Sequence, residues 1–295
     1  MFKKPATFVL LANLALVATG CAKAGVPTAI ATATKAAGVP TIMTASGKEF
    51  GLGFDDARYQ QVAKKTKVRK LPRQALLPTR VDLRDTCSPV ANQGKLGACT
   101  AFATGKGFRE FQINRRNERK TPLSAMFLYY EARALWGNTN EPTGSTCSDN
   151  ISVLEDKGMC PDETMPYDVA KYMIKPTAQA YDQAKEFKFS GAVRIGTLDD
   201  AQAAMAKGEA VLFAFDVMES FRKIGPDGVM PVPQAGEKRL GGHAVLAVGF
   251  DSQKHLVTVR NSWGADWADH GYFYMPYAVF QKTARDIWTA GVQAE

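Results

Sequence analysis

One stretch of the chain places a thiol just after a glycine turn, where a helix is expected to begin. It runs from Gln93 to Cys99 as QGKLGAC, and the small residues TAFAT follow it. Phe108, Phe111 and Ile113 then recur at roughly helical spacing. In a first helical turn, unpaired backbone N–H groups and the helix dipole favour thiolate over thiol. The stretch therefore predicts nucleophilic chemistry at Cys99, the alternative being a small apolar residue in a core helix.

A nucleophilic cysteine needs a base, and the chain contains three histidines. His243 lies in GGHAVLAVG, where a pair of glycines opens an apolar run typical of a buried strand. His255 and His270 each lie in a polar turn next to a strand pattern, which favours exposed positions for both. His243 is therefore the candidate base for Cys99.

A third polar residue, Asn261, ends a strand pattern in the motif VRNSWG. Its amide oxygen can accept a hydrogen bond from an imidazole N–H, which would fix the ring tautomer and aim the other nitrogen at the thiol. Trp263 would then shield that bond from water. A lone asparagine at a strand end is more often a simple turn residue, so the assignment depends on Cys99 and His243.

Taken together, these blocks resemble the papain family of cysteine peptidases. That family places a histidine and an asparagine about 130 to 150 residues after the cysteine. Here His243 follows Cys99 by 144 positions (243 − 99), and Asn261 follows it by 162 (261 − 99). Further matching motifs are VDLR at 81–84, GMCP at 158–161, MPY at 165–167, and WG at 263–264 followed by GY at 271–272. The resemblance covers most of residues 79 to 280.

The resemblance implies an activity and a role for each residue. Cys99 would be the nucleophile, His243 its base, and Asn261 the residue that orients His243. Gln93 would donate to the oxyanion of the tetrahedral intermediate. The implied reaction is peptide-bond hydrolysis through a thiolate–imidazolium pair and an acyl-enzyme, without a cofactor. By the same resemblance, the pKa of Cys99 is expected below its ordinary value.

The fold class follows from the order of the predicted elements. Helices are predicted first, at 98–113, 124–135, 151–156 and 199–207, and strands later, at 211–217, 244–250, 256–260 and 272–275. Helices followed by an antiparallel sheet are typical of an α+β fold. The resemblance implies the same fold, with Cys99 on a helical lobe that faces a β lobe carrying His243 and Asn261.

The sequence departs from the family pattern at three positions near the motifs. Leu96 stands where the family has a disulfide-forming cysteine, Thr100 replaces an aromatic residue, and Ala268 replaces a glycine. None of the three removes a catalytic group. The combination of QGxLGxCTAxA with a GGHA block looks like the bacterial branch of the family.

Substrate contacts are expected at four positions. Gly144 and Ser145 correspond to the glycine pair that binds substrate backbone in the family, and Gly242 precedes the candidate base. Thr146, together with Cys147, would border the main specificity pocket. The expected substrates are proteins or peptides.

The first 21 residues resemble a bacterial lipoprotein signal. Lys3 and Lys4 precede an apolar stretch from Phe8 to Ala18, and the segment ends in ATGC. In such a signal Cys21 is lipidated and becomes the new N-terminus. The alternative is an ordinarily cleaved signal. A lipid at Cys21 would anchor the exported protein to a membrane of the cell envelope, facing the periplasm or at the outer-membrane surface.

The remaining chain divides into three expected regions. Residues 22–47 are rich in Ala and Thr and are expected to form a flexible tether, residues 48–78 a basic leader or short pro-segment, and residues 79–295 the peptidase domain. Residues 1–80 contain 13 basic and 3 acidic residues, and residues 81–295 contain 24 and 26. Because the positive charge lies outside the domain, a nucleic-acid-binding function is not expected. Cleavage within 64–80 would release the domain.

The remaining cysteines and the alternative functions complete the expectations. Cys87, Cys147 and Cys160 permit at most one disulfide among themselves, and no Cys and His spacing suggests a metal site. A cell-wall peptide hydrolase and a papain-like fold used as a non-catalytic binding module are the alternatives to a peptidase. The protein is expected to act as a monomer.

Overall fold

The computed structural model describes residues 39–72, 76–116 and 121–291. Its α-helices are α1 (Asp56–Val62), α2 (Cys99–Ala101), α3 (Glu110–Arg115), α4 (Ala125–Ala134), α5 (Cys147–Asp156), α6 (Ala178–Ala184), α7 (Leu198–Ala206) and α8 (Tyr277–Thr283). Shorter or wider turns are η1 (Arg84–Thr86), η2 (Phe102–Arg109), η3 (Val169–Lys171), η4 (Lys185–Phe187) and η5 (Glu219–Lys223). The strands are β1 (Thr41–Met43), β2 (Glu49–Gly51), β3 (Arg80–Asp82), β4 (Ala192–Ile195), β5 (Val211–Met218), β6 (Arg239–Asp251), β7 (Leu256–Arg260), β8 (Tyr272–Pro276) and β9 (Arg285–Ala290).

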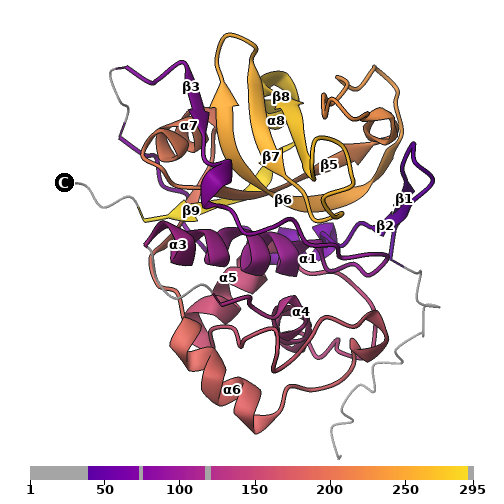
Figure 1. The fold of residues 1–295 in the computed structure, drawn as a ribbon, viewed down its shortest axis with the longest axis vertical. Coiled ribbons are helices and arrows are strands. Elements are labelled where there is room, and N and C mark those ends of the chain that lie inside the picture. Colours follow the sequence, from indigo (N-terminus) through magenta and orange to yellow (C-terminus); the bar gives the residue numbers. More distant parts are fainter. Residues whose placement is uncertain (1–38, 73–75, 117–120, 292–295) are drawn as a thin grey trace, which may run out of the picture. The chain divides into compact units, whose positions relative to one another are not determined.

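One continuous helix connects α2, η2 and α3 and lies against the sheet (Figure 1). It begins at Cys99, as predicted, and buries Phe102, Phe108 and Phe111 on its inner side. Its middle part has the wider turns of a π-helix. A Cβ atom at Gly105 would lie 2.2 Å from the Cε of Met159, so a side chain here would displace the end of the methionine. Cys99, the first residue of the helix, is fully buried.

The sheet is antiparallel and has the strand order β4-β9-β5-β6-β7-β8, with β3 added to β6. In its register, Phe215 on β5 faces His243 on β6, and Leu246 on β6 faces Arg260 on β7. Helices α4, α5 and α6 lie on one side of the central helix and the sheet on the other (Figure 1). A helical lobe and a β lobe of this kind form an α+β papain-like fold, which confirms the predicted fold class.

Two predicted elements begin four or more residues earlier in the structure than expected. Strand β6 begins at Arg239 rather than at 244, because every part of β5 from Val211 to Met218 pairs with it. His243 therefore lies inside the strand. Helix α5 begins at Cys147 rather than at 151, because Thr146 and Asp149 form a capping box that starts the helix earlier. Strands β4 and β9 and helices α6 and α8 were not predicted.

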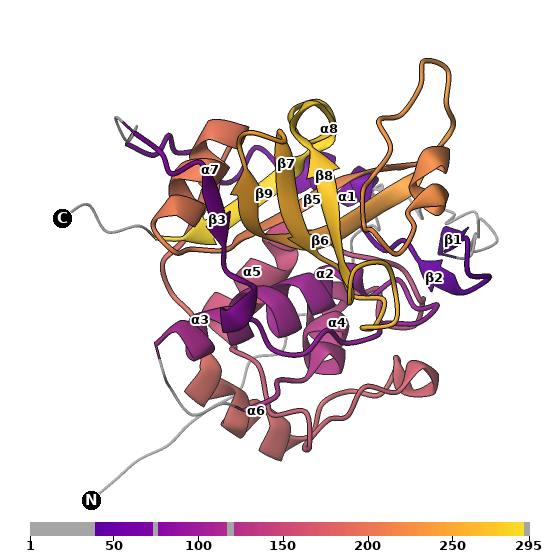
Figure 2. The ribbon, with the colours of Figure 1, turned by 45° about the horizontal axis from the view of Figure 1, so that its top comes forward.

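The tether expected over residues 22–47 is wrong for residues 39–47. Thr41–Met43 forms strand β1, which pairs with β2 and buries Ile42, so the hairpin crosses the expected boundary with the basic leader. Figure 2 shows this hairpin next to the end of β6. Residues 22–38, the signal segment and Cys21 lie outside the described residues.

Helix α1 follows the hairpin and contacts both lobes. The side chain of Asp55 caps it by accepting from the backbone N–H of Arg58 at 2.9 Å. Arg58 forms an ion pair with Asp149 on α5, and Asp56 forms one with Arg285 on β9. The hairpin and α1 therefore belong to the folded body. Among the described residues, no helix combines the length and apolarity that crossing a bilayer requires.

Candidate active site

His243 and Asn261 form a buried hydrogen-bonded pair at the edge of the β lobe. His243 Nε2 lies 2.8 Å from Asn261 Oδ1, and neither residue is more than 1% exposed. Neighbouring strands bring them together, because His243 lies within β6 and Asn261 directly follows β7. The Trp263 ring lies 5.0 Å from the imidazole, centroid to centroid, and helps to exclude water. The geometry is that expected of an imidazole oriented by an amide.

Cys99 lies opposite this pair, as the first residue of α2. Its side chain is fully buried, and the backbone N–H groups of Ala244 and Gly53 lie close to its sulfur and favour the thiolate. Ala244 directly follows His243, so the backbone of strand β6 runs beside the thiol. Gly53 belongs to residues 48–78, the expected basic leader.

Burial keeps both candidate groups in their neutral forms. It raises the pKa of Cys99 to about 11 and lowers the pKa of His243 to about 4. The imidazole Nδ1 is buried and has no hydrogen-bond partner among the described residues. The expectation of a lowered Cys99 pKa is therefore wrong for the structure described, because the leader covers the thiol and excludes the water that would stabilise a charged pair.

The side-chain amide of Gln93 points toward the chain around Gly51 and Leu96. Its Nε2 donates to the carbonyl oxygens of Gly51, at 3.0 Å, and Leu96, at 2.9 Å. Its Oε1 accepts from the hydroxyl of Ser262 at 2.6 Å, which fixes the direction of the amide. Tyr167 donates to the Gln93 carbonyl at 2.7 Å. The sequence analysis did not predict these roles, although Ser262 lies in the VRNSWG motif and Tyr167 in the MPY motif.

Residues 51–55, here called the cleft segment, cross the site as an extended strand. The backbone N–H of Ser145 donates to Gly53 O at 3.0 Å, and Asp55 N–H donates to Ser145 O at 3.0 Å. On the other side, Phe54 N–H donates to Gly242 O at 3.1 Å. The cleft segment is parallel to the chain at Ser145 and antiparallel at Gly242. These main-chain hydrogen bonds join the cleft segment to both lobes.

The cleft segment fits because its glycines allow close backbone contact. A Cβ atom at Gly53 would lie 1.9 Å from the carbonyl oxygen of Gly97, and one at Gly144 would lie 1.8 Å from Gly53 O. A side chain at either position would collide with main chain. The pattern of two glycines before Phe54 was the signal in the sequence that could have identified this segment.

The predicted substrate-contact residues divide into two groups. Gly144, Ser145 and Gly242 all touch the cleft segment, whereas Thr146 is turned away from it. The Thr146 hydroxyl accepts from the backbone N–H of Asp149 at 2.9 Å and so caps helix α5. Thr146 therefore caps helix α5, whereas it was expected to border the main specificity pocket.

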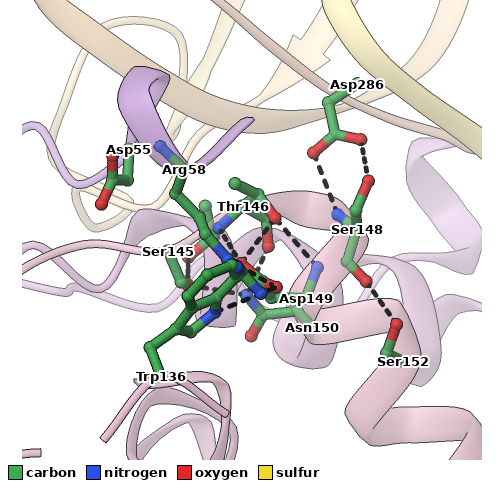
Figure 3. Close-up of polar contacts among 11 residues, drawn as sticks. Asp55, Arg58, Trp136, Ser145, Thr146, Ser148, Asp149, Asn150, Ser152 and Asp286 are labelled. Atoms are coloured by element: carbon green, nitrogen blue, oxygen red, sulfur yellow. Dashed lines mark hydrogen bonds and ion pairs between the residues drawn. The ribbon is translucent and has the colours of Figure 1, made fainter. Parts of the chain in front are cut away.

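A polar clamp holds α1 against the helical lobe. Figure 3 shows Arg58 reaching Asp149, with hydrogen bonds of 2.7 to 3.2 Å, beside Trp136. The Arg58 guanidinium also lies against the Trp136 ring, whose N–H donates to Asp149 at 3.3 Å. Burial raises the pKa of Asp149, while Thr146 and Arg58 favour its charged form. Because both charged side chains are largely shielded from solvent, the clamp depends on keeping both partners.

The two other histidines and the three other described cysteines have no role in the site. His255 and His270 are exposed in turns, as predicted. Cys87, Cys147 and Cys160 are free thiols, so the one disulfide that the sequence allowed among them is not formed. Within the three described ranges, no group of His, Cys, Asp and Glu could hold a metal ion.

Comparisons with known proteins extend these observations. A family model described as "Papain family cysteine protease" matches residues 77–286. An uncharacterized peptidase C1-like protein of Acanthamoeba polyphaga mimivirus is 34% identical over 210 residues, which is 67% of this chain and 68% of the relative. Pro-cathepsin H of Mus musculus is 32% identical over 208 residues, or 66% of this chain, which spans only 59% of that relative.

Solved structures show the same similarity. Xylellain, a cysteine protease from Xylella fastidiosa, superposes with a TM-score of 0.69 at 29% identity and covers 78% of this chain and 95% of its own. Digestive procathepsin L 3 of Tenebrio molitor, with a TM-score of 0.60 at 20% identity over 86% of this chain and 83% of its own, shares the fold. The chain belongs to the papain family of cysteine proteases and is a cysteine-type peptidase.

Proposed function

We propose that the protein is an exported cysteine endopeptidase made in a latent form, with its own cleft segment in place of substrate. One observation carries the proposal. An extended peptide backbone lies directly over Cys99 and is held by main-chain groups of Ser145 and Gly242 and by the side chain of Gln93. Main-chain groups that bind the backbone of an extended segment can bind the backbone of a peptide substrate in the same way.

The proposed reaction begins once the cleft segment has left. Water and substrate then enter, Cys99 transfers its proton to His243, and the thiolate attacks the carbonyl carbon of the substrate. Gln93 and the backbone N–H of Cys99 donate to the oxyanion, where one such donor contributes about 2.7 to 4 kcal/mol. The His243 imidazolium gives its proton to the leaving amine. Water, deprotonated by His243, then hydrolyses the thioester and restores the thiol.

The latent state is proposed from the covered site. With the cleft segment in place, Cys99 and His243 are buried and favour their neutral forms, so the charged pair that the reaction needs is absent. Residues 64–70 follow helix α1, lead toward the peptidase domain and are exposed along their whole length. Cleavage within 64–80 is therefore the proposed activating step.

Export and lipid attachment at Cys21 are proposed from the sequence of residues 1–21 alone, as is membership of the bacterial branch from the motifs around Cys99 and His243. A lipid at Cys21 would hold the precursor at a membrane of the cell envelope, and cleavage after residue 63 would free the domain from that anchor. The four proposed catalytic residues come from one chain, so a monomer is sufficient for the reaction.

Covalent labelling tests the proposed function. The protein without its signal is treated with an epoxide inhibitor of thiol peptidases and read by intact mass, with quenched-fluorescent peptide cleavage in parallel and Cys99→Ala as the control. One label at Cys99 after removal of the leader, together with peptide turnover, is expected. A folded and uncovered protein that takes the label without turnover would instead support a non-catalytic binding module. Cleavage restricted to cell-wall peptides would support the hydrolase alternative.

A further inference from the structure

The side chain of Phe54 fills a pocket beside Cys99, and an arginine forms part of its wall. Phe54 is 5% exposed, and the Arg285 guanidinium carbon lies 4.9 Å from the centre of its ring. A Cβ atom at Gly242 would lie 3.0 Å from the Phe54 ring and 3.1 Å from Arg285 Nη2, so the glycine leaves this pocket open on one side. The Phe54 ring therefore lies between a glycine backbone and the guanidinium of Arg285.

Three hydrogen bonds, one from Arg285 itself and two to the next residue, keep its position fixed. Arg285 Nη1 donates to the carbonyl oxygen of Thr283 at 3.1 Å. The next residue, Asp286, accepts from the backbone N–H and the hydroxyl of Ser148 at 2.9 and 2.5 Å (Figure 3). Because the guanidinium is already fixed, binding a carboxylate would cost little side-chain entropy.

The charge balance of the pocket depends on the leader. Arg285 Nη2 lies 2.6 Å from Asp56 and 2.9 Å from Asp216. Arg239 contacts the same two aspartates. Two arginines thus face two aspartates while α1 is docked. Asp56 belongs to α1 and leaves with it, so two arginines then share the single carboxylate of Asp216.

We propose that Arg285 is a specificity-determining residue that selects an acidic side chain, glutamate above all, in the pocket that Phe54 fills. This inference rests on the proposed function, since a substrate must take the place of the leader. A glutamate reproduces both parts of the contact that the leader makes. Its two methylene groups take the place of the Phe54 ring, and its carboxylate replaces Asp56 at the guanidinium.

Peptide cleavage by the activated enzyme tests the proposal. The full-length precursor is processed until intact mass shows that its leader is cut, and the epoxide inhibitor titrates the active sites. Two quenched-fluorescent libraries then carry Glu or its neutral analogue Gln at each position in turn. At one position, kcat/KM for Glu is expected to exceed that for Gln about fivefold or more, a modest ratio because the emptied pocket is open to solvent.

Variants at Arg285 separate charge from structure. Arg285→Gln is expected to bring the ratio of Glu to Gln close to one, and Arg285→Lys to keep most of it. Lys254→Glu is the charge control, because Lys254 is exposed in the turn after β6, at the opposite end of that strand from Gly242. It should leave the ratio unchanged. A ratio near one at every position of the unaltered enzyme, or one that Arg285→Gln does not lower, would overturn the proposal.

The uncut chain offers a second measurement that needs no turnover. In an Asp56→Asn background, Phe54→Glu places a carboxylate in the pocket within the leader itself, and Phe54→Gln is its neutral match. The glutamate variant is expected to unfold about 2–4 °C higher. The difference should vanish when Arg285→Gln is added. Equal unfolding temperatures with Arg285 present would overturn the proposal.

The two measurements also separate this inference from the proposed function. If the protein hydrolyses no peptide and takes no epoxide label, the proposed function fails, and the unfolding temperatures alone decide whether Arg285 recognises a carboxylate. If peptides are cleaved without a preference for glutamate, the peptidase stands and the role of Arg285 is lost.

Discussion

The side-chain amide of Gln93 donates to the carbonyl oxygen of Gly51 at 3.0 Å. The proposed oxyanion donor is therefore already engaged by a carbonyl group of the same chain. Gly53 lies against Cys99 two residues later, in a segment that is parallel to the chain at Ser145 and antiparallel at Gly242. In the proposed latent form, the cleft segment thus takes the place of substrate at both Gln93 and Cys99.

Alkylation of Cys99 should depend steeply on pH in the uncut chain. Because burial raises the pKa of this thiol to about 11, only roughly 10⁻⁴ of it is thiolate at pH 7. The rate with iodoacetamide should rise through pH 8 to 11, and after leader removal it should already be high at pH 6. Intact mass measures both rates, with Cys99→Ala correcting for other thiols. Rapid labelling of the uncut chain at pH 6 would contradict this prediction.

Loss of the clamp should expose the site without cleavage. Arg58→Ala leaves the Asp149 carboxylate buried without its partner, and we expect the free energy of unfolding to fall by about 3 kcal/mol. Epoxide labelling of Cys99 in the uncut chain should become faster. Denaturant unfolding and labelling rates measure the two effects. Arg58→Lys, which keeps the charge but not the paired hydrogen bonds, should lie between. An Arg58→Ala protein labelled as slowly as the parent would refute the clamp.

Gln93→Ala should slow peptide turnover in the processed enzyme and loosen the cleft segment in the uncut chain. In the processed enzyme, we expect kcat to fall about 10²- to 10³-fold, because one oxyanion donor is lost. In the uncut chain, the same change removes the hydrogen bond to Gly51 and should speed labelling of Cys99. Steady-state kinetics on titrated enzyme and labelling rates give the two readings. An unchanged kcat would remove Gln93 from the proposed mechanism.

His243→Ala and Asn261→Ala should differ in degree. Losing the base is expected to lower kcat about 10²- to 10⁴-fold. Asn261→Ala retains the imidazole but frees its orientation, so a smaller loss is expected, with less activity at every pH. Kinetics across pH 5 to 9 on folded, titrated protein test this order. Equal activity of Asn261→Ala and the parent would show that the 2.8 Å contact is not needed.

Trypsin should activate the precursor. Lys64, Lys65 and Lys67 are exposed, whereas residues 51–55 are covered by both lobes. Cleavage after these lysines is expected first, followed by the appearance of peptide turnover. Mass spectrometry over time identifies the cuts. Replacing the three lysines with glutamine should delay activation. Turnover that appears before any cut would mean that the leader opens without cleavage.

The sequence predicted the parts of the site that depend on local pattern. Cys99 begins its helix and His243 lies on a buried strand beside Asn261, because small residues, paired glycines and a strand end are local signals. The spacing along the chain identified the partners by resemblance. The α+β fold followed from the order of these same signals.

The rest depended on contacts between distant segments. The pKa of Cys99 was wrongly expected to be low, because nothing near Cys99 in the sequence indicates that Gly53 covers it. The hairpin was taken for a tether, since β1 and β2 are three residues each and become stable only by pairing and by burying Ile42. Arg285 was not singled out, because its significance arises from Phe54 and Asp56, which lie more than two hundred positions earlier.

In the proposed latent form, the exposed connection at residues 64–70 gives the leader a very high effective concentration at the cleft. A segment tied to its own cleft by a short linker experiences an effective concentration on the order of millimolar. One cut in the linker turns this intramolecular equilibrium into a bimolecular one, and dilution then determines how much enzyme is free. Activation of this protein should therefore depend on where the cut product goes as much as on the cut itself.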